Sequence, residues 1–225
     1  MKRFLTRARA RGWSEALRAE RDRLSSWWSS SDVLIVLSRP ADADFAPQPD
    51  LRFRPCAPDD AEKYARDIGT DTRETFAHRL THHTDCFVVE SNEQFVHASW
   101  AARERVFVGE IGKYFLPPRG SAYVYESYTR PEARGKGIYP YALSGIASEL
   151  NSGGVEELWI AVEASNTGSR RSISKASFKI RFEVPFSRRF GRLTVDLSRV
   201  TMPAGGEISD DPPRLAGSSN PSSNL

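Results

Sequence analysis

The stretch from Arg134 to Tyr139 carries the clearest chemistry of the chain, because it places two glycines and two cations at the start of an expected helix. Gly135 and Gly137 allow backbone conformations that other residues resist, and they leave no side chain in the way. The first N–H groups of a helix have no partners within it, and the helix dipole adds partial positive charge there. With Arg134 and Lys136 nearby, these features predict a backbone nest for the phosphates of a small cofactor.

The motifs that the loop lacks narrow the choice of cofactor. The P-loop pattern is absent, and Pro140 stands where the third glycine of the dinucleotide fingerprint would be. The loop resembles instead the acyl-CoA site of the GNAT superfamily of N-acyltransferases: Gln or Arg, two residues, Gly, one residue, then Gly or Ala. Arg134 is its first residue and Gly137 its central glycine, while Tyr139 replaces the small final residue. The alternative is a tight turn with solvated charges.

A second segment resembles the same superfamily. An apolar strand over residues 158–162 is followed by Asn166 and, three residues further on, by Ser169. This spacing resembles the superfamily's fifth strand and the helix after it, with Ser177 where Gly is usual. The resemblance runs from about residue 51 to residue 200. It implies an α/β fold with a mixed, splayed central β-sheet flanked by helices.

The resemblance also implies where the substrates bind. Acyl-CoA and an amine would approach either side of a splayed pair of parallel strands, expected at 123–129 and 158–162. Main-chain groups of the first strand would hold the pantetheine arm, and an amide near its end would stabilise the oxyanion. The cofactor-binding residues implied are Tyr128, Thr129, Arg134, Gly135, Lys136, Gly137, Ile138, Tyr139, Asn166 and Ser169.

Proton transfer is where the chain departs from the superfamily. Ile173 stands where many members have a tyrosine that protonates the leaving thiolate, so another donor, water or no specific donor must serve. Tyr123 occupies a position that often holds the base, and Tyr125 is next on the same strand face. Glu126 is the only carboxylate in this strand; a bulge would turn it inward, and partial burial would raise its pKa. Packing or ion pairing is the alternative role for each, and Glu163 is a weaker candidate.

Other chemical signals carry less weight. His78 and His82 are four residues apart, but HExxH is absent and no third ligand is evident, so no metal site is expected. His97 is interpreted as a structural histidine, with a place in the acceptor groove as the alternative.

Length and composition predict one core with appendages. Of 225 residues, 39% are hydrophobic and 11% aromatic, which is enough for a packed domain. The net charge of +3 is mild, with eight Lys or Arg against three acids in the first 23 residues. Two cysteines are too few for a disulfide framework, which suits a reducing cytoplasm. No apolar run approaches the roughly 18 residues of a membrane span.

The expected elements alternate in a way that indicates an α/β protein with a mixed sheet. Helices are expected over 1–28, from 57, and over 71–83, 139–151 and 169–177; strands are expected over 32–38, 51–55, 86–91 and 94–103 (a hairpin), 106–111, 123–129, 158–162, 181–184 and 193–200. The predicted organisation is an N-terminal extension with a helix and a strand (1–44), a GNAT-like domain (45–200) and a disordered tail (201–225).

The sequence therefore predicts a cytoplasmic enzyme that moves an acetyl group from acetyl-CoA, its cosubstrate, to a primary amine of a small molecule. It predicts no nucleic-acid partner and no metal. Three alternatives stay open: a transferase of longer acyl or aminoacyl groups, a non-catalytic CoA-binding module suggested by Ile173, and an adaptor that binds membrane or nucleic acid through its arginine-rich N-terminus. The acceptor and the presence of a homodimer are also open.

Overall fold

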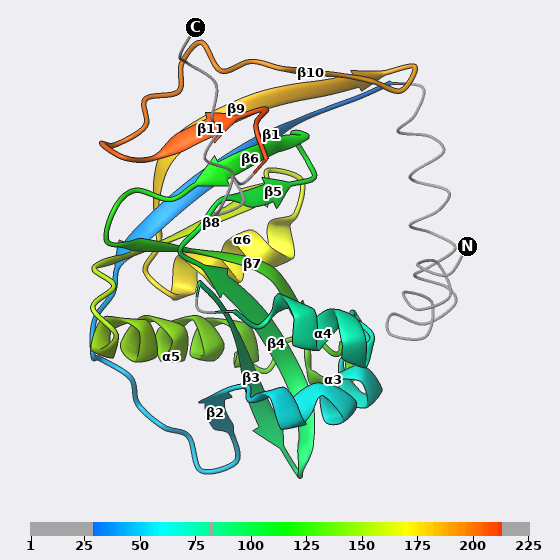
Figure 1. The fold of residues 1–225 in the computed structure, drawn as a ribbon, viewed down its shortest axis with the longest axis vertical. Coiled ribbons are helices and arrows are strands. Elements are labelled where there is room, and N and C mark those ends of the chain that lie inside the picture. The colour runs from blue at the N-terminus through cyan, green and yellow to red at the C-terminus, as the bar shows by residue number, and fades with distance from the viewer. Residues whose placement is uncertain (1–28, 82, 213–225) are drawn as a thin grey trace, which may run out of the picture.

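The computed structural model describes residues 29–81 and 83–212 (Figure 1). Its elements are β1 (Ser29–Pro40), β2 (Arg52–Pro55), the 3-10 helix η1 (Pro58–Asp60), α3 (Ala61–Asp67), α4 (Arg73–Arg79), β3 (Thr84–Ser91), β4 (Gln94–Ala102), β5 (Val106–Val108), β6 (Lys113–Leu116), β7 (Ser121–Thr129), the 3-10 helix η2 (Pro131–Ala133), α5 (Ile138–Ser152), β8 (Glu157–Glu163), α6 (Thr167–Lys175), β9 (Lys179–Arg189), β10 (Arg192–Val195) and β11 (Glu207–Ser209). The helix expected over 1–28, His82, and residues 213–225 of the expected tail lie outside the described residues.

The strands form one large sheet and one small one. The large sheet has eight strands in the order β10-β9-β1-β8-β7-β4-β3-β2, and the small sheet has the order β11-β6-β5. Only β7 and β8 are parallel among the paired strands of the large sheet. The mixed, splayed sheet flanked by helices confirms the predicted fold class. Within the described part, no helix has both the length and the apolar character needed to cross a membrane.

Strand β1 corrects the expected domain boundary near residue 45. It lies between β8 and β9 and pairs antiparallel with both, so it is a central strand and not part of an extension. Its apolar run does not alternate with polar residues because both faces are covered. Ile35 and Leu37 pack in the core below α5 and α6, while Leu34 and Val36 pack on the opposite face.

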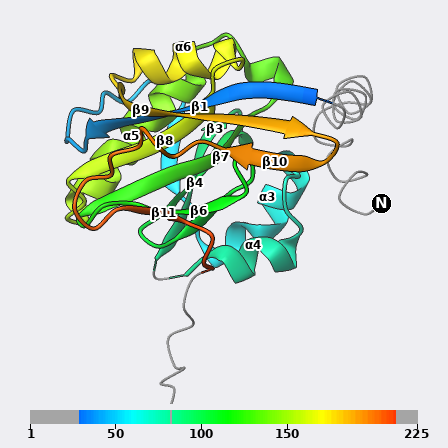
Figure 2. The ribbon, with the colours of Figure 1, turned by 90° about the horizontal axis from the view of Figure 1, so that it is seen from above.

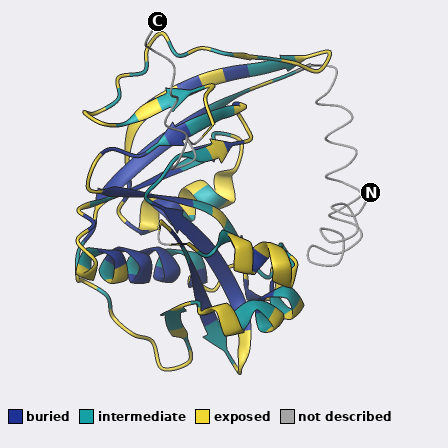
Figure 3. Cartoon of the chain, in the orientation of Figure 1, coloured by how far each residue is buried: buried dark blue, intermediate teal, exposed yellow. Residues whose placement is uncertain are grey.

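Different elements cover the two faces of the large sheet. Figure 2 shows α6 on one side and the α3–α4 pair on the other. The core on the α5–α6 side includes Val124, Ile160 and Ile173, whereas Phe76, Trp100 and Tyr128 lie in the core beneath α3 and α4. The small sheet covers a third core cluster. The central strands are accordingly buried along most of their length (Figure 3).

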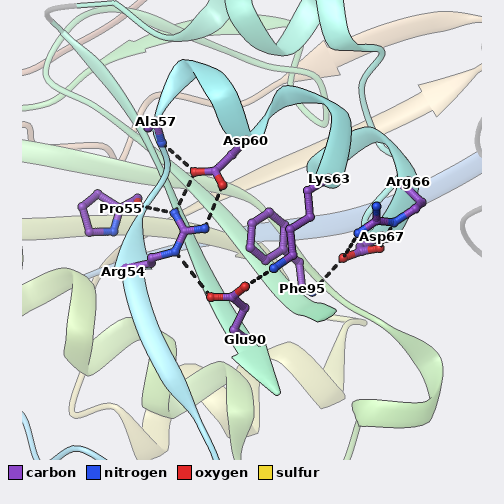
Figure 4. Close-up of polar contacts among 9 residues, drawn as sticks. All are labelled: Arg54, Pro55, Ala57, Asp60, Lys63, Arg66, Asp67, Glu90 and Phe95. Atoms are coloured by element: carbon purple, nitrogen blue, oxygen red, sulfur yellow. Dashed lines mark hydrogen bonds and ion pairs between the residues drawn. The ribbon is translucent and has the colours of Figure 1, made fainter. Parts of the chain in front are cut away.

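A network of ion pairs fixes α3 to the edge of the sheet (Figure 4). Arg54 of β2 makes two hydrogen bonds of 2.7 Å to Asp60 and one of 3.4 Å to Glu90. Lys63 of α3 also bonds Glu90, and its ammonium lies 4.4 Å from the centroid of the Phe95 ring. The bidentate Arg54 contact lowers the pKa of Asp60. Helix α3 is therefore held by partly buried charges as well as by packing.

Two further segments differ from the sequence-based expectation. The tail expected to be disordered contributes Glu207–Ser209, which pair antiparallel with β6 from Leu116 to Tyr114. The helix expected over 71–83 ends at Arg79, because Leu80 adopts an extended ψ of 109°. Neither segment has a strong periodic pattern of its own, so a tertiary partner decides its conformation. The hairpin of β3 and β4 is confirmed.

Ser177 ends the turn after α6 with φ of 66°, in the left-handed region where glycine is favoured. Left-handed backbone costs a residue with a side chain about 1–2 kcal/mol. We expect Ser177→Gly to raise the free energy of unfolding by about 1 kcal/mol, measured by urea titration. Ser174→Gly is the control; it lies within α6 and should be destabilising. A less stable Ser177→Gly protein would contradict this reading of the turn.

Candidate active site

The loop between β7 and α5 has the geometry of an open backbone cradle. Gly135 and Gly137 have φ of 78° and 77°, so both need the left-handed conformation that glycine adopts without strain. A methyl group placed on either glycine would meet no atom within 4 Å. The glycines are thus required by backbone conformation alone, and the space above them is free for a ligand.

The amides of this loop are available as donors. The Tyr141 amide donates to the Gly137 carbonyl at 3.2 Å and is the first of α5 to find a backbone acceptor. Within residues 29–81 and 83–212, the amides from Gly135 to Tyr139 have no protein acceptor. The Arg134 side chain bends back to the strand, where its Nε donates to the Thr129 carbonyl at 3.1 Å. Unsatisfied amides at a helix start form an anion-binding site.

The parallel strands next to the loop pair over only part of their length. The pairing of β7 with β8 runs from Ser121–Glu157 to Val124–Ile160 and stops there. Beyond Val124, the other edge of β7 stays paired with β4 as far as Thr129. The edge of residues 125–129 that faces β8 therefore has no strand partner among the described residues. The two strands therefore splay apart beyond Val124 and Ile160, as the sequence predicted, and we call this opening between them the wedge.

Glu126 lies in a bulge, but it does not turn inward. Its φ is 47°, and the β4–β7 register shifts between Ala98 and Trp100 at this point. The Glu126 side chain is 61% exposed and accepts a hydrogen bond of 2.8 Å from Arg79. The expectation of a partly buried carboxylate is therefore wrong. The bulge directs Glu126 towards α4 because Arg79, which also bonds Asp71 at 2.7 Å, lies there.

Tyr123 and Tyr125 of β7 lie on the face opposite to α5. Their rings are stacked, with centroids 6.2 Å apart, and Phe115 lies 4.8 Å from Tyr123. Burial raises the pKa of both hydroxyls, and Arg79 partly opposes this at Tyr125. A phenol with a raised pKa stays protonated near neutral pH, so neither tyrosine is ready to act as a base.

Asn166 and Ser169 have a structural task in this fold. Asn166 is the N-cap of α6, and its Oδ1 accepts a hydrogen bond of 3.1 Å from the Ser169 amide. Ile173, two turns along α6, is 1% exposed and packs in the core. Glu163, at the end of β8, has a pKa raised by burial and then by Glu110 and Asp32.

Sequence reasoning missed a chain of polar side chains under α5. His97 Nδ1 lies 2.7 Å from Thr129 Oγ1, and Nε2 lies 2.8 Å from Ser99 Oγ. Ser99 Oγ in turn lies 2.8 Å from Ser127 Oγ. The His97–Ser99 spacing on one strand face was the available signal, but Ser127 joins them only because the bulge shifts β7.

Fold and loop together define an α/β protein in which a splayed pair of parallel strands opens next to an anion-binding helix start. A family model described as "Acetyltransferase (GNAT) family" matches residues 54–178, and the chain belongs to this family. The match leaves out β1 and the strands after α6. No curated protein matches the chain.

Solved structures resemble the chain in fold at low identity. A GCN5-related N-acetyltransferase from Sphaerobacter thermophilus is 16% identical with a TM-score of 0.51, over 79% of this chain and 56% of that protein. An aminoglycoside acetyltransferase from an uncultured soil metagenomic sample, in complex with sisomicin, is 14% identical with a TM-score of 0.46, over 56% of this chain and 87% of that one. The ribosomal-protein-S18-alanine N-acetyltransferase of Escherichia coli is 13% identical with a TM-score of 0.47. The match covers 63% of this chain and 95% of that protein.

Burial lowers the pKa of His97 to about 3, whereas an unfolded chain has a histidine pKa of about 6.5. Between these two pKa values, His97 is protonated in the unfolded chain but stays neutral in the folded protein. The free energy of unfolding therefore falls as the pH drops from about 6.5 towards 3. We expect this group to lower the free energy of unfolding by about 2 kcal/mol between pH 7 and pH 5. Urea titrations at both pH values should show a smaller drop for His97→Gln than for wild type. The exposed His83→Gln is the control, and an unchanged drop in His97→Gln would refute the assignment.

Proposed function

We propose that the chain transfers an acetyl group from acetyl-CoA to a primary amine of a small molecule. The observation that carries the proposal is the row of amides from Gly135 to Tyr139, which have no acceptor among the described residues, next to the part of β7 where the pairing with β8 has ended. Membership of the acetyltransferase family supports the same chemistry. We also propose a cytoplasmic location, in keeping with two free thiols, Cys56 and Cys86.

The residues present fit a pyrophosphate handle. The amides of the loop would bind its oxygens, and the space above Gly135 and Gly137 leaves room for it. Lys136 is exposed beside them and would add a full positive charge. The pantetheine arm would extend along residues 125–129 of β7, beyond the point where the pairing with β8 ends, and would bind main-chain donors and acceptors there.

The reaction then needs positioning, charge stabilisation and one deprotonation. Holding the amine against the thioester supplies much of the rate, since bound reactants no longer have to meet. An amide of β7 near Tyr128 would stabilise the oxyanion. Glu126 is the base we propose, because its carboxylate lies on the acceptor side and Arg79 fixes its direction. Tyr123 and Tyr125 would line the acceptor side.

One observation favours a second candidate, a CoA-binding module without turnover. Ile173 fills the place of the usual proton donor and is buried in the core. Arg79 also pairs with Glu126, so the only carboxylate of β7 is already engaged in an ion pair. This candidate predicts CoA binding with no acyl transfer.

A thiol-release assay separates the two candidates. We expect full-length protein with acetyl-CoA to release free CoA in the presence of at least one class in a panel of amino sugars, amino acids, polyamines and peptides. The release should need the amine, and mass spectrometry should find the acetylated amine. Binding of acetyl-CoA without release across the panel would support the module, whereas no binding by folded protein would refute both.

Gly137→Ala tests the cradle directly. Alanine is unfavourable in the left-handed conformation, so the backbone of the loop must change and its amides no longer point at a common position. We expect the Kd for acetyl-CoA, measured by isothermal titration, to rise at least about tenfold. The matched control is Gly154→Ala, whose φ of 83° and open surroundings resemble those of Gly137 but lie at the other end of α5. Equal affinities in the two variants would contradict a ligand role for the loop.

A further inference from the structure

A continuous chain of polar side chains lies beneath the start of α5. It consists of Thr129, His97, Ser99, Ser127 and Tyr139, and we call it the hydroxyl chain. The three contacts from Thr129 to Ser127 are 2.7, 2.8 and 2.8 Å long. At the end of the chain, burial raises the pKa of the Tyr139 hydroxyl, and the Ser127 side chain lowers it by a smaller amount. The His97 and Tyr139 rings also lie against each other, with centroids 5.3 Å apart.

Stability alone gives no reason for this arrangement. His97 and Ser99 are 1% and 0% exposed, and burying polar groups is costly unless each is partnered. Each is partnered here, yet apolar side chains of the same shape would fill the space at similar stability. The hydroxyl chain does, however, place polar side chains, His97 and Ser127, beside the phenol of Tyr139.

That hydroxyl lies on the side of the sheet from which the missing proton donor would act. Tyr139 packs against the core cluster that contains Ile173, so the phenol and the isoleucine share one face of the sheet. Ser127, its partner, is three residues beyond Val124, where the pairing of β7 with β8 ends. The Tyr139 side chain thus lies over the face of the sheet that carries His97, while its amide belongs to the loop.

The three tyrosines of β7, which are Tyr123, Tyr125 and Tyr128, pack on the face of the sheet opposite to α5 and α6. The Arg79 guanidinium lies 5.6 Å from the centroid of the Tyr125 ring. Tyr123 packs with Phe115 on the opposite face. Of these hydroxyls, only that of Tyr139 lies on the face that α5 and α6 cover.

We infer that Tyr139, oriented by Ser127 and the rest of the hydroxyl chain, protonates the departing thiolate in place of the residue at position 173; this rests on the proposed acetyl transfer. The amine nitrogen forms a bond to the thioester carbon, and the carbon–sulfur bond breaks with its electron pair on sulfur. Sulfur takes the Tyr139 proton. Glu126, the proposed base, takes one proton from the bound ammonium before the attack and later returns it to solvent. The phenolate takes the second proton, which the nitrogen releases as the amide forms, by way of Ser127 or water, so no further reactant is needed.

The test uses free CoA and needs no acceptor. A hydroxyl that donates to the bound sulfur stabilises the thiolate, so it lowers the pKa of the bound thiol. Ultraviolet titration of the bound thiolate should show that this pKa rises by about one unit in Tyr139→Phe. Tyr141→Phe is the matched control, because its hydroxyl, on the same helix, donates to the Leu51 carbonyl at 3.1 Å. Desulfo-CoA provides the blank for the protein's own tyrosines and thiols.

Each outcome decides a different point. A shift in Tyr139→Phe alone supports the inference, whereas no shift, or equal shifts in both variants, overturns it while CoA binding stands. A wild-type protein that binds no CoA overturns the proposed function and this inference together. With any amine that is turned over, Tyr139→Phe should lower kcat about 100-fold and leave KM for acetyl-CoA within about twofold. Ser127→Ala should also lower kcat, and Ser127→Thr should restore it.

Discussion

The short parallel pairing of β7 with β8 is the constraint on which the candidate site depends. It ends at Val124 and Ile160, although both strands continue. Each keeps its other neighbour, β4 for β7 and β1 for β8, so the strands stay rigid where they separate. The bulge at Glu126 adds local twist and turns β7 away from β8. An unpaired strand edge is otherwise a liability; here it meets the open amides that begin α5.

The two faces of the sheet differ in charge around this wedge. On the α3–α4 side, Arg79 forms ion pairs with Asp71 and Glu126, and its guanidinium lies 4.0 Å from the centroid of the Trp100 ring. On the α5 side, His97 is neutral, and its partners are hydroxyls. Charged groups that are partly solvated suit recognition of an amine, whereas neutral buried groups hold a fixed proton donor. The wedge thus separates two environments that an acyl transfer can use.

The fold was predicted well where local pattern and tertiary role agree. The β3–β4 hairpin and α5 follow from alternation and helix signals in the sequence. The position of β1 did not follow, because a buried apolar strand carries no information about its neighbours. Strand β11 was missed because Glu207–Ser209 are only three residues with a single apolar side chain, Ile208, and gain their structure from pairing with β6. Both errors concern long-range pairing, which depends on partners far away in the sequence.

The sequence by itself determined the loop. Glycine is favoured where φ is positive, so Gly135 and Gly137 predict a left-handed backbone in the loop. The exposed amides of the loop follow from this conformation. Only the tertiary structure decided where the side chains of β7 point. The register shift opposite Trp100 sends Glu126 to Arg79 and brings Ser127 to Ser99. Backbone conformation is a local property of residue type, but side-chain partners across strands depend on register, which packing of the whole sheet sets.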